Sequence, residues 1–170
     1  MATKPEVWLR GPVEGVPGHL QPVAHALLQA AEEVDSITAN FPDALLWERP
    51  EGLASVGFHL RHIAGVVDRL FTYARGETLS AEQREALRVE SEPGGEAEGV
   101  VQLRARIRRQ VEKALEQLRA TDPATLLDAR GVGRAQLPST VLGLLFHAAE
   151  HTQRHVGQLL VTARIVSARR

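Results

Sequence analysis

The chain has 170 residues, of which 44% are apolar and 24% are charged, and its formal net charge is −1. A chain of this size buries roughly 70% of the surface that its unfolded form exposes, so one hydrophobic core is sufficient. Acidic and basic residues are mixed along the chain and leave no large field, which argues against a nucleic-acid partner. We expect a single domain over residues 1–170, with an extended N-terminal arm over residues 1–18.

The sequence contains no apolar segment long enough to cross a membrane. Its longest apolar run, residues 141–146, is interrupted by Gly143 and is far shorter than the roughly 20 residues that span a bilayer. The first residues include acidic residues and prolines and lack the apolar region of a secretory signal. We therefore expect no membrane partner and a cytoplasmic location.

The first long helix is predicted to begin near Leu20 and to end at Phe41. Pro42 ends it because proline lacks the backbone N–H that the next turn would need. Apolar residues recur at spacings of three and four, as on the buried face of a helix. They are Leu20, Ala24, Leu27, Ala31 and Val34.

Two further helices are predicted between residues 55 and 92. Ser55 is a suitable N-cap for a long helix that ends at Gly76, the residue type preferred just after a helix C-terminus. Ser80 is placed to cap a short surface helix over residues 81–87. The sequence Pro-Gly-Gly at residues 93–95 then predicts a turn.

The last two long helices follow this turn. One is predicted from Glu96, with Glu96 and Glu98 in its first turn, to about Thr121. The sequence gives no clear assignment for residues 122–138, beyond a short β-like or irregular stretch around residues 128–135. The other begins at residues 138–140, and its apolar line is Val141, Leu144, Leu145, Ala148, Leu159 and Ile165. Four long amphipathic helices predict an all-α protein, a four-helix bundle with long connections between its helices.

Five of the seven histidines fall in two clusters on the second and the last long helix. His147, His151 and His155 are spaced by four residues, so each is turned by about 40° from the last along one side of the helix. This side coincides with the apolar line, so these imidazoles should point into the bundle. His59 and His62 lie three residues apart on the second helix, and either could face the last helix.

This clustering favours a metal site. The chain has no cysteine, so any metal ligands must come from His, Asp, Glu and water. A pair of histidines at i and i+4 offers two neutral nitrogens from a rigid helix. The alternative is that the imidazoles are ordinary core residues, which is the commoner role of an isolated half-buried histidine. Burying five of them without compensation would be costly, and a shared cation would account for all of them.

Two other metal motifs fit less well. His147, Glu150 and His151 match the inverted zinc-peptidase pattern H-x-x-E-H, in which Glu150 would be the general base. Such sites need a further acidic ligand downstream, and no Asp or Glu follows His151. The Glu-x-x-His pattern of ferritin-like di-iron proteins is absent from the predicted helices.

The segments GFHLRHIAG and LLFHAAEHTQRHVGQLL resemble the second-helix and last-helix motifs of the DinB/YfiT-like metalloenzymes, which are four-helix proteins with a histidine triad. By position, the resemblance implies that His62, His151 and His155 bind the metal. It places His59 and His147 beside the ligands or in the core, and Gln158 where it would orient an imidazole or a water. Glu150 becomes a candidate base if it faces the cavity, and Gly157 is expected to permit close helix packing.

The resemblance also implies a function. Three histidine ligands leave a coordination position open for water, which is the catalytic arrangement. The family suggests a metal-dependent hydrolase, or an S-transferase that activates a low-molecular-weight thiol, and it suggests a homodimer. Zinc and nickel are the leading ions, and iron and manganese are also compatible. The alternative is a non-catalytic stress-related or binding protein that acts through dimerisation.

One departure from the family motif concerns charge. Many relatives have Arg after the last ligand, where this chain has Val156. Its role in binding an anionic group could be taken by Arg61, Arg69 or Arg154. Each of the three is more simply interpreted as a solvated charge on a helix surface.

Overall fold

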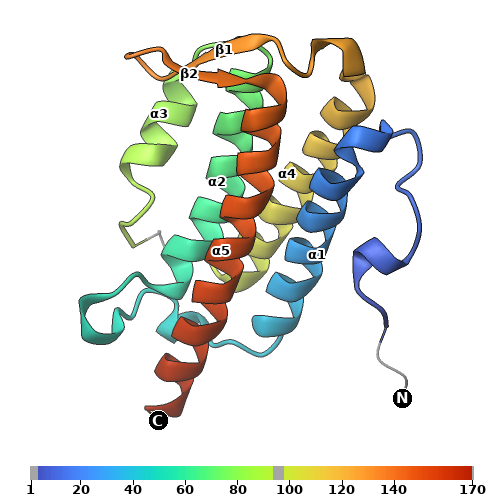
Figure 1. The fold of residues 1–170 in the computed structure, drawn as a ribbon. Coiled ribbons are helices and arrows are strands. Elements are labelled where there is room, and N and C mark those ends of the chain that lie inside the picture. The colour runs from blue at the N-terminus through green and yellow to red at the C-terminus, as the bar shows by residue number, and fades with distance from the viewer. Residues whose placement is uncertain (1–3, 94–97, 170) are drawn as a thin grey trace.

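The computed structural model describes residues 4–93 and 98–169, and within them the chain forms five α-helices and one β-hairpin (Figure 1). The helices are α1 (Gln21–Ile37), α2 (Val56–Ala74), α3 (Ala81–Arg88), α4 (Val100–Ala120) and α5 (Val141–Ala168). The strands are β1 (Ala129–Val132) and β2 (Leu137–Thr140). No helix in these ranges is both long and apolar enough to cross a membrane.

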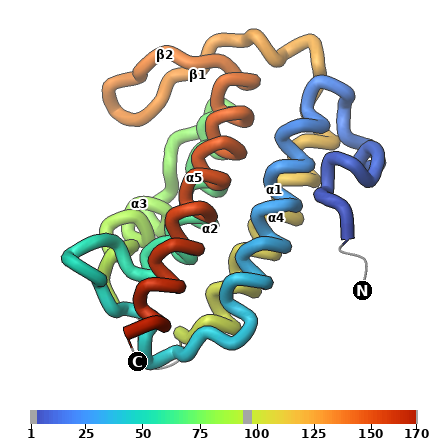
Figure 2. The backbone as a smooth tube through the Cα atoms, turned by 60° about the horizontal axis from the view of Figure 1, so that its bottom comes forward, coloured from blue at the N-terminus to red at the C-terminus, as the bar shows by residue number. Residues whose placement is uncertain are grey.

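The four long helices α1, α2, α4 and α5 form the predicted bundle. The helix α2 packs against both α5 and α4, and α1 packs against the same two helices from the other side (Figures 1 and 2). Their apolar faces meet in one core, whose fully buried side chains include Leu27, Leu60, Phe71, Leu103, Ile107, Leu145 and Leu159. The all-α prediction is confirmed, and the side-by-side packing of α2 and α5 brings the two histidine clusters together.

The β-hairpin is a small addition to the all-α architecture. The strands β1 and β2 pair antiparallel, with Ala129 opposite Thr140. Residues 128–135, for which a β-like or irregular stretch is predicted, thus contain β1, but Pro138 and Ser139 belong to β2 and do not open the last helix. Thr140 is the N-cap of α5, because its side chain accepts a hydrogen bond from the Gly143 N–H. The hairpin covers the end of the bundle where α2 ends and α5 begins (Figure 1).

The helix ends that depend on local caps lie where the sequence places them. The Ser55 side chain accepts a hydrogen bond from the Phe58 N–H at the start of α2. Gly76, just after α2, has a φ of 80°, a left-handed conformation that costs glycine little. Ser80 and Gln83 form a reciprocal capping box at the start of α3. The turn predicted at residues 93–95 lies partly outside the described residues.

The start of α4 differs from the prediction. Its first residue is Val100, so Glu98 precedes the helix, and Glu96 lies outside the described residues. The N-terminal charge comes instead from Asp43, whose Oδ1 accepts a hydrogen bond from the Val100 N–H at 2.8 Å. A carboxylate there satisfies a free N–H and interacts favourably with the helix dipole.

The variant Asp43→Ala is expected to lower the free energy of unfolding by about 1 kcal/mol, the typical effect of losing an N-cap. Urea unfolding monitored by circular dichroism would measure this change. The exposed variant Glu14→Ala, far from this helix start, serves as the control. An Asp43→Ala protein as stable as the wild type would show that this bond contributes little.

The N-terminal segment is not an extended arm. Residues 4–20 include two short 3-10 turns, Val7–Leu9 and Gly18–Leu20, and lie along α1 (Figure 2). Val7 and Val16 are buried, and Arg10 pairs with Glu32 on α1. Buried valines and this ion pair fix a segment whose prolines and glycines predicted only an irregular conformation.

Candidate metal centre

Three histidines converge between α2 and α5. His62 comes from α2, and His151 and His155 come from consecutive turns of α5. One nitrogen of each lies within 4.8 Å of a nitrogen of the other two, and the Nε2 atoms of His62 and His151 are 3.0 Å apart. All three imidazoles are half-buried, so the bundle covers part of the cluster and the rest remains accessible to solvent.

The three imidazoles fit a divalent ion. Two nitrogens bound to one tetrahedral zinc at about 2.1 Å lie about 3.4 Å apart, so small side-chain rotations would suffice. Burial and the neighbouring histidines lower the pKa of His155 to about 3. Burial, with a smaller effect of His62, also lowers the pKa of His151. Imidazoles must be neutral to bind a metal, and these two are neutral at pH 7. In addition, the buried Nδ1 atom of His151 has no hydrogen-bond partner among the described residues.

His59 and Phe58 line the cluster on α2. His59 is only 3% exposed, and its Nδ1 atom lies 3.1 Å from Nδ1 of His155. Its burial lowers its pKa to about 4, with a smaller contribution from His62. Phe58 stacks on the His62 ring, with the ring centroids 5.2 Å apart. His59 therefore contacts a predicted ligand directly, and Phe58 forms an aromatic wall beside another.

Glu90 is a site residue that the sequence did not indicate. It follows α3, is 5% exposed, and its Oε2 lies 2.7 Å from Nδ1 of His62. Its Oε1 accepts a hydrogen bond from Nη1 of Arg69 at 2.9 Å. Burial alone would raise the pKa of Glu90, but the hydrogen bonds with His62 and Arg69 lower it below its ordinary value. The available signal was Arg69 itself, a charged residue beside the buried face of α2 that required a carboxylate partner.

The arginines occupy different environments. Arg69 is buried against Glu90, so its interpretation as a solvated surface charge is wrong. Arg61 pairs with Glu98 and donates hydrogen bonds to the carbonyls of residues 89 and 92, which ties the connection between α3 and α4 to α2. Arg154 is exposed, as predicted for a surface charge, and pairs with Glu150.

His147 was predicted to point into the bundle, but it does not. Its side chain is 48% exposed, because successive steps of four residues rotate it away from the core face. Its Nδ1 lies 2.8 Å from Oε1 of Glu150, and Arg154 donates to both oxygens of the same carboxylate. His147, Glu150 and His151 form a second group with metal-ligand spacing, but the Glu150 carboxylate is already engaged by Arg154.

Two predicted supporting residues on α5 are exposed. Gln158 makes no hydrogen bond to a histidine within the described ranges. Gly157 is also exposed, and a Cβ built there would meet no atom within 4 Å, so the expected close helix packing at this glycine is wrong. Both residues follow His155 on α5, and their positions on the helix face solvent.

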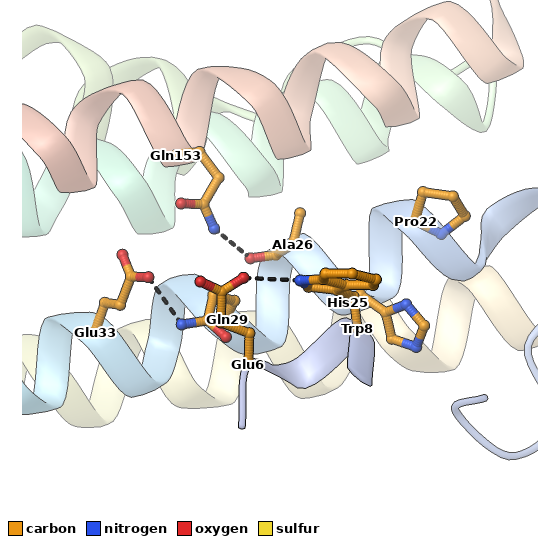
Figure 3. Close-up of a pocket in the computed structure, with 8 residues that line it drawn as sticks. All are labelled: Glu6, Trp8, Pro22, His25, Ala26, Gln29, Glu33 and Gln153. Atoms are coloured by element: carbon orange, nitrogen blue, oxygen red, sulfur yellow. Dashed lines mark hydrogen bonds between the residues drawn. The ribbon is translucent and has the colours of Figure 1, made fainter. Parts of the chain in front are cut away.

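Two cavities differ in their relation to the histidines. A cavity of about 560 Å³ lies between the N-terminal segment and α1, and Gln153 reaches into it from α5 (Figure 3). Gln153 is on the flank of α5 opposite His151, and its amide donates to the Ala26 carbonyl. A smaller cavity of about 180 Å³ is lined by Phe58, Ser55, Ala54, Arg49 and Ser91. Through Phe58, only the smaller of these two adjoins the histidine cluster.

Comparisons with known proteins agree with this fold. The chain is similar to a conserved protein from Enterococcus faecalis of known crystal structure, with 18% sequence identity and a TM-score of 0.68. That similarity covers 88% of this chain and 97% of the other. No curated protein matches the sequence. A family model described as the DinB superfamily matches residues 26–159, a range that contains His62, His151 and His155. The chain therefore belongs to the DinB superfamily.

Proposed function

We propose that His62, His151 and His155 hold one divalent metal ion and that the chain is a metal-dependent enzyme. The convergence of three imidazole nitrogens within 4.8 Å of one another supports the proposal most directly. Three neutral nitrogens without a thiolate suit zinc or nickel, and also iron or manganese. We prefer this group to His147, Glu150 and His151, because Arg154 competes with a cation for the Glu150 carboxylate.

The half-buried cluster leaves one side of a bound ion open to solvent or substrate. When bound, a divalent ion with three protein ligands supplies Lewis acidity toward water, a thiol or a carbonyl oxygen. The chain's own residues shape the space beside it: Phe58 excludes water from one face of His62, and the adjoining cavity of about 180 Å³ admits a small group. Together with the resemblance to the DinB/YfiT-like metalloenzymes, this leads us to infer a hydrolase or a low-molecular-weight-thiol S-transferase. Glu150 is the candidate base, although it would have to leave Arg154 to accept a proton.

Activity assays separate this enzyme from the non-catalytic alternative. Thiol and ester substrates would be screened with protein loaded with zinc, nickel or manganese, and His62→Ala would be assayed beside the wild type. Turnover that is lost in His62→Ala, while circular dichroism shows the fold retained, is the expected result. Absence of turnover with every substrate and metal, together with a chelator that only lowers the melting temperature, would favour a binding protein.

The proposed homodimer is tested independently. Analytical ultracentrifugation of the metal-loaded and chelated protein should give twice the 18.6 kDa chain mass in both states. A monomer in both states would exclude the dimer and would weaken the alternative that acts through dimerisation.

A further inference from the structure

A buried ion pair lies directly behind His62. Glu90 and Arg69 are 5% and 9% exposed, and each is hydrogen-bonded to the other at 2.9 Å. Burying two charges is costly, and such pairs often stabilise a fold no more than apolar residues of similar volume would. The remaining carboxylate oxygen of Glu90 meets Nδ1 of His62 at 2.7 Å.

A glycine in the middle of α2 makes room for this pair. A Cβ on Gly65 would lie 2.5 Å from Oε1 of Glu90 and 2.6 Å from Nη1 of Arg69. Both atoms are the ends of flexible side chains, so any other residue at position 65 would displace the pair and not the helix. Glycine inside a helix costs about 1 kcal/mol relative to alanine. The close approach of Glu90 and Arg69 explains this costly residue.

We propose that Glu90 is a positioning residue that fixes the tautomer and the orientation of His62, with Arg69 and Gly65 holding its carboxylate in place. An ionised carboxylate only accepts hydrogen bonds, so Nδ1 of His62 must carry the proton. In the neutral ring, which is the form that binds a metal, the other nitrogen, Nε2, is then unprotonated, and it faces Nε2 of His151 at 3.0 Å. Metal-bound histidines commonly donate their second N–H to a carboxylate in this way. The ligand atom of His62 is thus Nε2, an assignment that rests on the proposed metal site.

A merely structural role of the same contacts would have different consequences. Glu90 also lies at the start of the connection between α3 and α4, and its pairing with Arg69 attaches that connection to α2. If attachment were its whole function, the tautomer of His62 would not depend on the residue at position 90. The tautomer can be observed in the metal-free protein, so this distinction does not require a bound ion or an assay of activity.

The first experiment compares wild type with Glu90→Gln by 15N NMR of the His62 ring nitrogens in metal-free protein. The wild type should show a protonated Nδ1 and an unprotonated Nε2. The glutamine amide can donate to Nδ1, so the variant should shift the proton toward Nε2. A wild-type His62 with its proton on Nε2, or an unchanged tautomer in Glu90→Gln, would overturn the proposal.

The second experiment measures zinc affinity and adds a variant, Gly65→Ala, that keeps the charges of both Glu90 and Arg69. Gly65→Ala and Gly157→Ala make the same change in two helices, but only the first introduces a methyl group against the Glu90 and Arg69 side chains. We expect Gly65→Ala and Glu90→Gln to weaken zinc binding by about 10- to 100-fold, the range for residues that support metal ligands. Gly157→Ala should bind zinc as the wild type does. Equal affinities in all four proteins would overturn the positioning role. A wild type that binds no zinc would instead refute the metal site, and the NMR comparison alone would then decide the role of Glu90.

Discussion

The variants His151→Ala and His155→Ala should each lower the affinity for zinc by at least about 100-fold, because residues that only support ligands already reach this value. Each substitution removes one of three nitrogens that lie within 4.8 Å of one another. Two remaining imidazoles hold an ion with fewer bonds and leave it accessible to competing chelators. Competition with a chromophoric chelator would measure the affinity.

The matched control for these variants is His147→Ala. His147 lies on the same helix at the same four-residue spacing, but its side chain is 48% exposed and belongs only to the second group. It should bind zinc as tightly as the wild type. If His147→Ala loses zinc while His155→Ala retains it, the ion binds to His147, Glu150 and His151, and the assignment of the three-histidine site is wrong.

The metal-free protein should lose stability as the pH falls below 6.5. The folded-state pKa of His59 is depressed from 6.5 to about 4 by its burial, and that of His155 to about 3. Between pH 6.5 and these folded-state pKa values, the unfolded chain binds more protons than the folded chain. Lowering the pH through this range therefore favours unfolding. For His59 alone, lowering the pH from 6.5 to 5 should cost about 2 kcal/mol, since one pKa unit corresponds to about 1.4 kcal/mol. The stability is fully present above pH 6.5.

Urea unfolding of chelated protein at pH 7.5, 6.5 and 5 would measure this dependence. His59→Gln should reduce the slope with pH, whereas the exposed His19→Gln should leave it unchanged. Zinc added at pH 7.5 should raise the stability further, because it binds only the folded state. Stability that is constant between pH 7.5 and 5 would contradict the buried, neutral state of these imidazoles.

The sequence predicted those parts of the fold that depend on neighbouring residues. Ser55 and Ser80 cap the helices that follow them, as predicted, since a cap and its N–H partner lie within three residues. Apolar residues that recur every three or four positions predicted the four long helices, because this spacing is also a local property of the sequence. The family motifs likewise selected His62, His151 and His155, which the structure brings together.

Contacts between distant residues could not be predicted in this way. Asp43 caps α4 from 57 positions away, and Glu90 reaches His62 across 28 positions. Neither contact leaves a periodic signal, because its geometry is set by how the helices pack. The faces of long helices were also misjudged: His147 and Ile165 are more exposed than predicted, since small rotations per turn accumulate along α5.

Anomalous X-ray diffraction at the zinc edge, from crystals of untagged protein grown with zinc, would locate the ion. We predict one anomalous peak between His62, His151 and His155, within about 2.1 Å of the three nitrogens, with Nε2 as the ligand atom of His62. A peak at His147 and Glu150, or no peak near any of these histidines, would show that His62, His151 and His155 do not hold the metal together.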